Sequence, residues 1–139
     1  MEYNTIKVTK NNYHQFEDMI FWRIHNKERT EEQKLLSKEK MNSRILNELN
    51  NSNLYIYAVV IESRMVGWIS LIYLLKVGKF GRKGHIYIDE LWIHPLYRRN
   101  GLAKELMKKA DEIAKTLDLT GIRLYVNITN QEAKELYER

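Results

Sequence analysis

Three β-prone segments follow one another in the middle of this chain and constrain its fold more than any other feature. The segments are Leu54–Ile61, Val66–Leu74 and His85–Ile93, and all are rich in Tyr, Val, Ile or Leu. The first two are nearly continuous in apolar residues, which is typical of strands that are covered on both faces. Glu62–Met65 predicts a hairpin turn between them, and the three glycines of Val77–Gly84 predict a loop. We therefore expect a meander of three strands.

Segments in which apolar residues recur at helical spacing lie on both sides of this meander in the sequence. A short strand at Thr5–Thr9 comes first, and Asn11 and Asn12 can cap a helix after it. Thr30–Gln33 has the form of a capping box and opens a second predicted helix, whose apolar face reaches Leu49. A third helix is predicted after the meander from apolar residues that recur every three or four positions: Leu102, Leu106, Ala110, Ile113 and Leu117.

The end of the sequence adds a strand and a helix. Ile122–Ile128 is β-prone, and Asn130 can cap a last helix from Gln131 onward. A strand, a helix and a strand in succession imply a right-handed crossover between parallel neighbours. With 139 residues and no linker-like segment, the chain is expected to form one domain over residues 1–139. The predicted fold class is α+β, with a mixed central β-sheet flanked by helices.

The composition favours a packed domain and excludes some kinds of site. Hydrophobic residues make up 44% of the chain, but no apolar run approaches the roughly 20 residues that span a bilayer. The amino terminus lacks the pattern of a secretory signal, so we expect a cytoplasmic protein without a membrane partner. The absence of cysteine excludes disulfides and thiolate metal sites. The four histidines show no spacing typical of a metal pair, so no metal is expected.

The positive charge of the chain is compatible with several partners. A formal net charge of +5 attracts polyanions, which include phosphorylated cofactors and nucleic acid. The basic loop at Lys76–Lys83 would be the place for nucleic acid. However, the aromatic residues lie in predicted core strands rather than between exposed cations, so no nucleic-acid partner is expected.

The segment Arg98–Lys104 links the end of a predicted strand to the start of a predicted helix. Peptide amides at a helix start have no intrahelical partner, and the helix dipole adds positive potential there, so this position suits a phosphate group. Gly101 and Ala103 have little or no side chain, which lets a pyrophosphate approach the backbone. The basic side chains of the segment are Arg98, Arg99 and Lys104. The alternative interpretation is an ordinary helix start with small residues in its first turn.

Two further motifs give this segment a context. Before it stands Leu91-Trp92-Ile93-His94-Pro95, and Asn130–Arg139 reads Asn-Gln-Glu-Ala-Lys-Glu-Leu-Tyr-Glu-Arg. Together with Arg98-Arg99-Asn100-Gly101-Leu102-Ala103, these motifs resemble the GNAT acetyltransferase superfamily. That family's acyl-coenzyme A loop reads Arg/Gln-x-x-Gly-x-Gly/Ala, and its later element reads Asn-x-x-Ala-x-x-Leu-Tyr-Glu-Lys/Arg.

The resemblance implies an N-acetyltransferase that uses acetyl-coenzyme A (acetyl-CoA) and a primary amine. Because no cysteine can carry an acyl intermediate, direct attack by the amine is expected. The resemblance further implies that the loop amides bind the coenzyme pyrophosphate and that the preceding strand bonds the pantetheine arm. The implied coenzyme-binding residues are Leu91, Trp92, Ile93, Arg98, Arg99, Asn100, Gly101, Leu102, Ala103, Lys104 and Asn130. For Asn130, helix capping alone is an equal alternative.

Three residues are candidates for catalysis. Tyr137 lies about two helical turns after Asn130, and in similar proteins this tyrosine protonates the departing thiolate; the alternative is a tyrosine that only packs the core. Asp89 and Glu90 are adjacent in a strand and are expected to face opposite sides, so one can serve as the base for the amine. Glu90 is preferred, although a bulge would exchange the two. A solvated strand charge is the alternative for either.

The resemblance also concerns acceptor specificity and the end of the fold. It places specificity in Ile20–Leu35, with Trp22, His25 and Glu28, and in the loop that holds Lys79, Phe80 and Arg82. Because the family usually continues with a Gly-Phe turn and further strands, the fold is expected to lack, or not to show, its C-terminal strands. An open sheet edge favours cover by another chain, so a homodimer is one expectation. The alternative function is a non-catalytic acyl-CoA-binding sensor or interaction module on the same fold.

Overall fold

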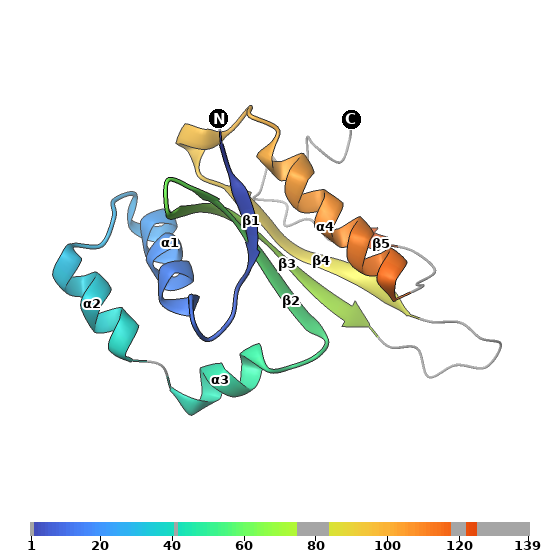
Figure 1. Ribbon diagram of the computed structural model, residues 1–139, viewed down its shortest axis with the longest axis horizontal. Helices are drawn as coiled ribbons and strands as arrows, with labels where there is room; N and C mark the ends of the chain where they lie inside the picture. The colour runs from blue at the N-terminus through green and yellow to red at the C-terminus, as the bar shows by residue number, and fades with distance from the viewer. Residues whose placement is uncertain (1, 41, 75–83, 118–121, 125–139) are drawn as a thin grey trace.

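A mixed β-sheet forms the centre of the protein. The computed structural model describes residues 2–40, 42–74, 84–117 and 122–124 (Figure 1). Within these residues the strands lie in the order β1-β2-β3-β4-β5. Their bounds are Asn4–Lys7, Leu54–Ile61, Arg64–Leu74, His85–Ile93 and Ile122–Leu124. Neighbours from β1 to β4 are antiparallel, whereas β5 is parallel to β4. The α+β fold with a mixed sheet is therefore confirmed.

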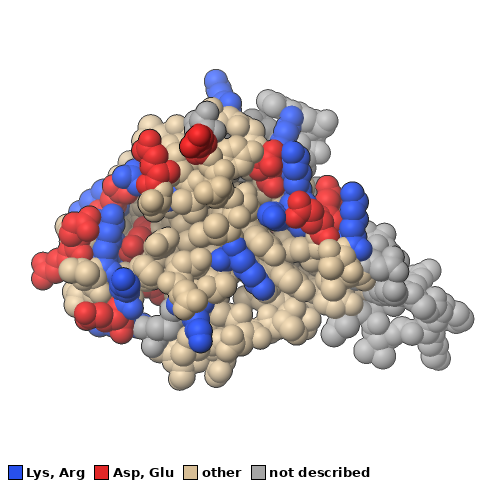
Figure 2. All heavy atoms as spheres, in the orientation of Figure 1, with Lys and Arg blue, Asp and Glu red and all other residues tan. Residues whose placement is uncertain are grey.

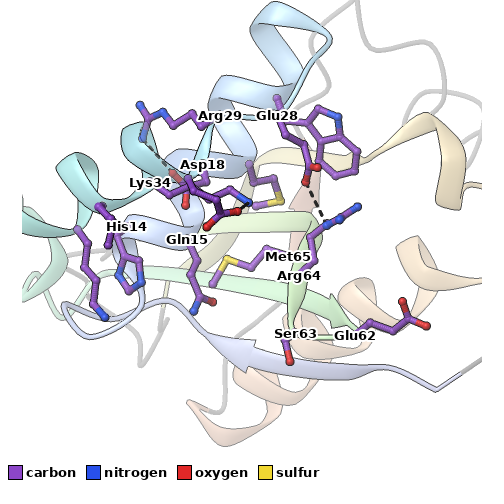
Figure 3. Close-up of a pocket in the computed structure, with 15 residues that line it drawn as sticks. His14, Gln15, Asp18, Glu28, Arg29, Lys34, Glu62, Ser63, Arg64 and Met65 are labelled. Carbon is purple, nitrogen blue, oxygen red and sulfur yellow. Dashed lines mark hydrogen bonds and ion pairs between the residues drawn. The ribbon is translucent and has the colours of Figure 1, made fainter.

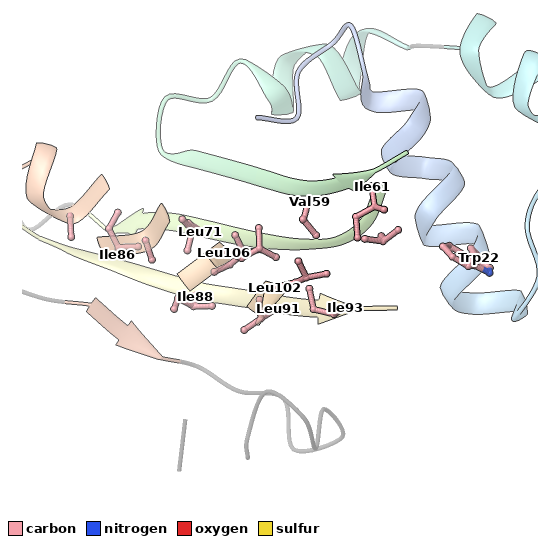
Figure 4. Close-up of a cluster of buried hydrophobic side chains, with 14 residues drawn as sticks. Trp22, Val59, Ile61, Leu71, Ile86, Ile88, Leu91, Ile93, Leu102 and Leu106 are labelled. Atoms are coloured by element: carbon pink, nitrogen blue, oxygen red, sulfur yellow. The ribbon is translucent and has the colours of Figure 1, made fainter. Parts of the chain in front are cut away.

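Helices cover both faces of this sheet. Their bounds are Tyr13–His25 for α1, Glu31–Glu39 for α2, Ser43–Leu49 for α3 and Leu102–Thr116 for α4. One buried cluster includes Leu102, Leu106 and Ala110 of α4 together with residues of β2, β3 and β4 (Figure 4). A second cluster packs Met19 of α1 against the opposite face, where Trp68 lies. This burial on both sides explains the continuous apolar pattern of the central strands.

Hydrogen bonds of polar side chains explain where the observed elements differ from the expected ones. The capping box is confirmed, since Thr30 Oγ1 accepts from the Gln33 amide at 3.2 Å and Gln33 Oε1 from the Thr30 amide at 2.8 Å. The expected continuation of this helix to Leu49 is wrong. Asn42 Oδ1 accepts from the Ile45 amide at 2.8 Å and starts α3 as a separate helix.

The beginning of the chain also differs from its prediction. The first strand ends at Lys7 instead of Thr9, because the Thr9 amide donates to Asn12 Oδ1 at 2.8 Å and the chain turns there. Asn12 precedes α1 as expected, but its side chain makes no cap bond to that helix. Its Nδ2 instead donates to the Lys7 carbonyl. The residue therefore stabilises the turn after β1 rather than the start of α1.

The turn between β2 and β3 is tighter than expected. Glu62 and Ser63 have φ of 50° and 64°, which is the left-handed pair of a two-residue hairpin turn. Arg64 and Met65, expected in the turn, belong to β3. Val60 pairs with Met65 and Val59 with Gly67, so one extra residue of β3 forms a bulge between them.

The surface shows no single region of one charge in the view of Figure 2, where acidic and basic side chains are interspersed over α2 and α4. On α4 they form ion pairs such as Lys108–Glu105, at 2.8 Å. Within the described residues, no helix has the length and apolar character needed to cross a membrane. The same residues contain no cluster of three His, Asp or Glu side chains suited to a metal ion.

Candidate active site

A bulge in β4 sets the direction of its acidic side chains. Ser70 pairs with Glu90 and Leu71 with Ile88, so Asp89 is an extra residue without a partner in the register. After the bulge, Glu90 and Trp92 share the face covered by α1, while Leu91 packs into the cluster on the α4 side. Both carboxylates are exposed. The alternation expected for a regular strand therefore does not apply between Asp89 and Glu90.

Glu90 is held by a cation on α1. Arg23 Nη1 lies 3.2 Å from Glu90 Oε2, in a pair whose side chains are 40% and 49% exposed. The guanidinium carbon of Arg23 is 5.2 Å from the Trp68 ring centre and 5.8 Å from that of Trp92. Arg23 lies in the segment Ile20–Leu35, where the resemblance places acceptor specificity, but the sequence did not single it out, because its partners come from β3 and β4 and only the fold brings them together.

The turn after β4 is fixed by its own polar side chains. His94 Nδ1 accepts from the Leu96 amide at 3.2 Å and starts a 3-10 turn, Pro95–Tyr97. Arg98 Nε donates to the Ile93 carbonyl at 2.7 Å. Asn100 Nδ2 donates to the carbonyls of Tyr97 and Arg98 at 3.1 and 3.2 Å. These bonds hold the backbone that leads into α4.

The start of α4 has the geometry of an anion site. Gly101, the N-cap residue, has φ of 76° and offers no side chain to the first amides of the helix. No atom outside its chain neighbours lies within 4 Å of the position that a Cβ would take there. Lys104 is exposed in the first turn, and Arg99 precedes it in a left-handed conformation. Open backbone amides and neighbouring cations therefore occur together at this turn.

A pocket of about 400 Å³ lies elsewhere, between α1, α2 and the β2–β3 turn (Figure 3). Its charged side chains pair with one another: Glu28 with Arg64 at 3.1 Å and Asp18 with Arg29 at 3.1 Å. Of the expected coenzyme-binding residues that the structure describes, Leu91–Ile93 and Arg98–Lys104, none lines it. Trp22 and Glu28 do, and they belong to the segment in which acceptor specificity was expected.

Comparison with known proteins decides the family. The model of the acetyltransferase (GNAT) family matches residues 18–139. The chain belongs to this family. No curated protein sequence matches the chain.

Solved GNAT structures show the same fold. An aminoglycoside acetyltransferase from an uncultured soil metagenomic sample has a TM-score of 0.76 at 20% identity, over 99% of this chain and 90% of that one. A ribosomal-protein-alanine N-acetyltransferase from Brucella melitensis biovar Abortus 2308 has a TM-score of 0.72 at 14% identity, over 99% of this chain and 89% of that one. AAC(6')-Iy, solved with the bisubstrate analogue CoA-S-monomethyl-acetylneamine, has a TM-score of 0.68 at 11% identity, over 99% of this chain and 88% of that one.

The structure describes only some of the expected GNAT site residues. The strand and turn place the coenzyme candidates from Leu91 to Lys104 along one continuous segment. The side chains of Leu91, Trp92 and Ile93 are buried, so these residues can offer only backbone groups to a ligand. Pairing of β4 with β5 is described from Ile86 to Ile88. The residues after 124 lie outside the description, so the expected separation of the two strands stays a prediction.

Other GNAT candidates lie wholly outside the described residues. They are Asn130, Tyr137, Lys79, Phe80 and Arg82. Their roles remain expectations that follow from the resemblance. The sequence predicts only that His94 is not a metal ligand. Its surroundings in the fold could not be predicted from its position before a proline.

His94 joins α1 to the turn that leads into α4. Its ring stacks on Trp22, with centroids 3.4 Å apart and 21° between the planes, and lies edge-on to Tyr97. Burial lowers the pKa of His94 below its ordinary value of 6.5, and the charges of Arg98 and Arg64 lower it further. In the neutral ring Nδ1 accepts from the Leu96 amide, and a proton on Nδ1 would abolish that bond.

We therefore expect stability to depend on pH through His94. Because its pKa is lower in the folded state, the unfolded chain binds the proton more readily, so this contribution is complete above about pH 6.5 and is lost as pH falls towards the folded-state pKa. The denaturant midpoint of the wild type should fall between pH 7.5 and 5. His94→Phe keeps a ring on Trp22 but cannot titrate, so its midpoint should change less over that range. Equal pH dependence in both proteins would contradict this assignment.

Proposed function

We propose that this GNAT protein is an N-acetyltransferase that transfers the acetyl group of acetyl-CoA to a primary amine. The observation that carries the proposal is the arrangement of β4, its bulge and the uncapped start of α4 on one continuous segment. The acidic side chain at the bulge and the helix start to which we assign the anion lie on the same short segment, which supports the proposal. Acyl transfer from a phosphorylated donor to an amine needs a site that binds the phosphates and a base that takes the proton of the amine.

The coenzyme would lie along this segment. Its pyrophosphate fits the open amides of Leu102, Ala103 and Lys104 at the start of α4, with the charges of Arg99 and Lys104 beside it. The backbone of Leu91–Ile93 would bond the pantetheine arm and the thioester carbonyl. Arg98 and Asn100 already bond to carbonyls of the turn, so we assign them chiefly to shaping the loop. Asn130 would either contact the arm or cap the helix that follows it.

The chemistry requires one proton to leave the amine and one to reach the thiolate. A protonated amine cannot attack, so a carboxylate must take its proton directly or through water. We assign this role to Glu90 rather than Asp89, because the ion pair with Arg23 joins Glu90 to α1, where the acceptor segment begins. As the new C–N bond forms, the C–S bond breaks, and Tyr137 would give its proton to the departing sulfur. With no cysteine in the chain, the amine attacks the thioester directly.

The test is an assay of free thiol release from acetyl-CoA against a panel of amines. We expect release that depends on the amine and on the presence of active protein. Thermal stabilisation by acetyl-CoA without turnover against any amine would instead support an acyl-CoA sensor. If acetyl-CoA neither stabilises the protein nor is consumed, both functions are contradicted.

A further inference from the structure

Arg23 is a cation held on a rigid aromatic surface. Its guanidinium lies over Trp68 and Trp92, which are 1% and 9% exposed and have ring centroids 5.1 Å apart. The edge of Phe16 packs on Trp68 and restrains it further. A guanidinium on the face of an indole is attracted by the ring, and it loses little freedom when it then binds a ligand. Arg23 is thus fixed before any ligand arrives.

The pair of Arg23 and Glu90 leaves binding groups open to solvent. Among the described residues, the one hydrogen bond of the Arg23 side chain joins its Nη1 to Glu90 Oε2. A guanidinium carries several further N–H donors, and a carboxylate accepts on both oxygens. Because both side chains are about half exposed, an unused donor lies beside an unused acceptor at the surface. This arrangement is complementary to a ligand with adjoining positive and negative groups.

We propose that Arg23 binds an anionic group of the acceptor and that the acceptor is an amino-acid-like zwitterion. This inference rests on the proposed N-acetyltransferase function. The amine would lie against Glu90 and the carboxylate against Arg23, so charges of opposite sign alternate around the contact. The existing ion pair need not break, since each partner uses its remaining atoms.

The same geometry opposes a polycationic acceptor. The similar solved structures include an aminoglycoside acetyltransferase. A substrate with several ammonium groups would place a positive charge close to Arg23 when one of its amines reached Glu90. Such like-charge contacts are costly in a partly buried site. A carboxylate beside the amine removes this conflict and adds a charge-assisted hydrogen bond.

The test compares each amino acid with the amine that remains after its carboxylate is removed, such as tyrosine with tyramine and phenylalanine with phenethylamine. For the wild type we expect kcat/KM to favour the amino acid by roughly 10- to 100-fold, the range for one charge-assisted contact. Arg23→Gln should raise the KM of the amino acid until this preference disappears. Loss of the Arg23–Glu90 ion pair acts on both members of each pair alike, so it cancels in the ratio of their kcat/KM values. Arg23→Lys should retain part of the preference, because it keeps a charge over the rings.

The control is Arg44→Gln, which removes the same charge from the exposed Arg44–Glu48 pair on α3 and should leave the preference unchanged. Equal kcat/KM for both members of each pair in the wild type would overturn the inference. So would a preference that survives in Arg23→Gln.

Binding separates this inference from the proposed function. Trp68 and Trp92 lie under Arg23, so ligand binding to CoA-saturated protein can be followed by tryptophan fluorescence even where no turnover occurs. If the amino acid binds more tightly than its decarboxylated amine, and Arg23→Gln abolishes that difference, the contact between Arg23 and the carboxylate is supported. This holds even if the protein releases no thiol and the proposed transferase function fails. If the amino acid binds no better than its amine, the contact is refuted whether or not thiol is released.

Discussion

Gly101→Asp should weaken acetyl-CoA binding roughly 100-fold, because a carboxylate would stand where the pyrophosphate is expected. A like charge about 4 Å away costs on the order of a few kcal/mol at an effective dielectric constant near 20. The fold should tolerate the change. Nothing lies within 4 Å of the new Cβ, and Asp bears the strain of a left-handed backbone more easily than most residues do. Calorimetric titration with acetyl-CoA measures the loss, and thermal unfolding checks stability.

Gly101→Asn is the matched control for this experiment. It has the same shape and backbone tolerance but no charge, so it reports only the steric part of the effect. We expect its affinity to lie between those of the wild type and Gly101→Asp. Wild-type affinity in both variants would show that the coenzyme phosphates bind elsewhere.

Tyr137→Phe should lower kcat by roughly 100- to 10,000-fold, the range for loss of a general acid. A phenol with a pKa near 10 is protonated at neutral pH and can give its proton to the departing sulfur, which phenylalanine cannot do. The KM for acetyl-CoA should change little, because the ring is kept. Steady-state kinetics with a saturating amine measures the effect.

Tyr55→Phe serves as the comparison for this variant, since it removes the same hydroxyl from β2, away from β4 in the sheet. Its kcat should match the wild type. An unchanged kcat in Tyr137→Phe would remove the tyrosine from the mechanism while leaving the family assignment intact.

Much of the fold could be predicted from local patterns. The meander and α4 follow from hydrophobic periodicity, which depends on residues near one another in the sequence. The failures also have local causes. A single Asn42 side chain divides the expected second helix, and Asn12 bonds to the turn before α1 instead of to the helix. Such side chains offer competing bonds to the backbone, and the sequence does not rank them.

The site divides in a similar way. The turn before α4 and its glycine could be predicted because the motif is contiguous. Arg23 could be placed only within the broad segment Ile20–Leu35. Its contacts with Glu90, Trp68 and Trp92 could not be predicted, because they depend on the packing of α1 across β3 and β4. The same holds for His94 and Trp22, whose stacking joins α1 to the turn after β4. Long-range pairs of this kind leave no periodic signal.

The extra residue in β4 affects how this chain can be aligned with its relatives. If β4 is matched without a gap to a strand that has no bulge, every residue after Asp89 is displaced by one position. In a strand, that displacement assigns each side chain to the wrong face. At identities of 20% and below, the sequences themselves do not fix where the gap belongs. Substrate-contacting positions should therefore be transferred by superposing backbones outward from the Ser70–Glu90 pair, not by counting residues across the bulge.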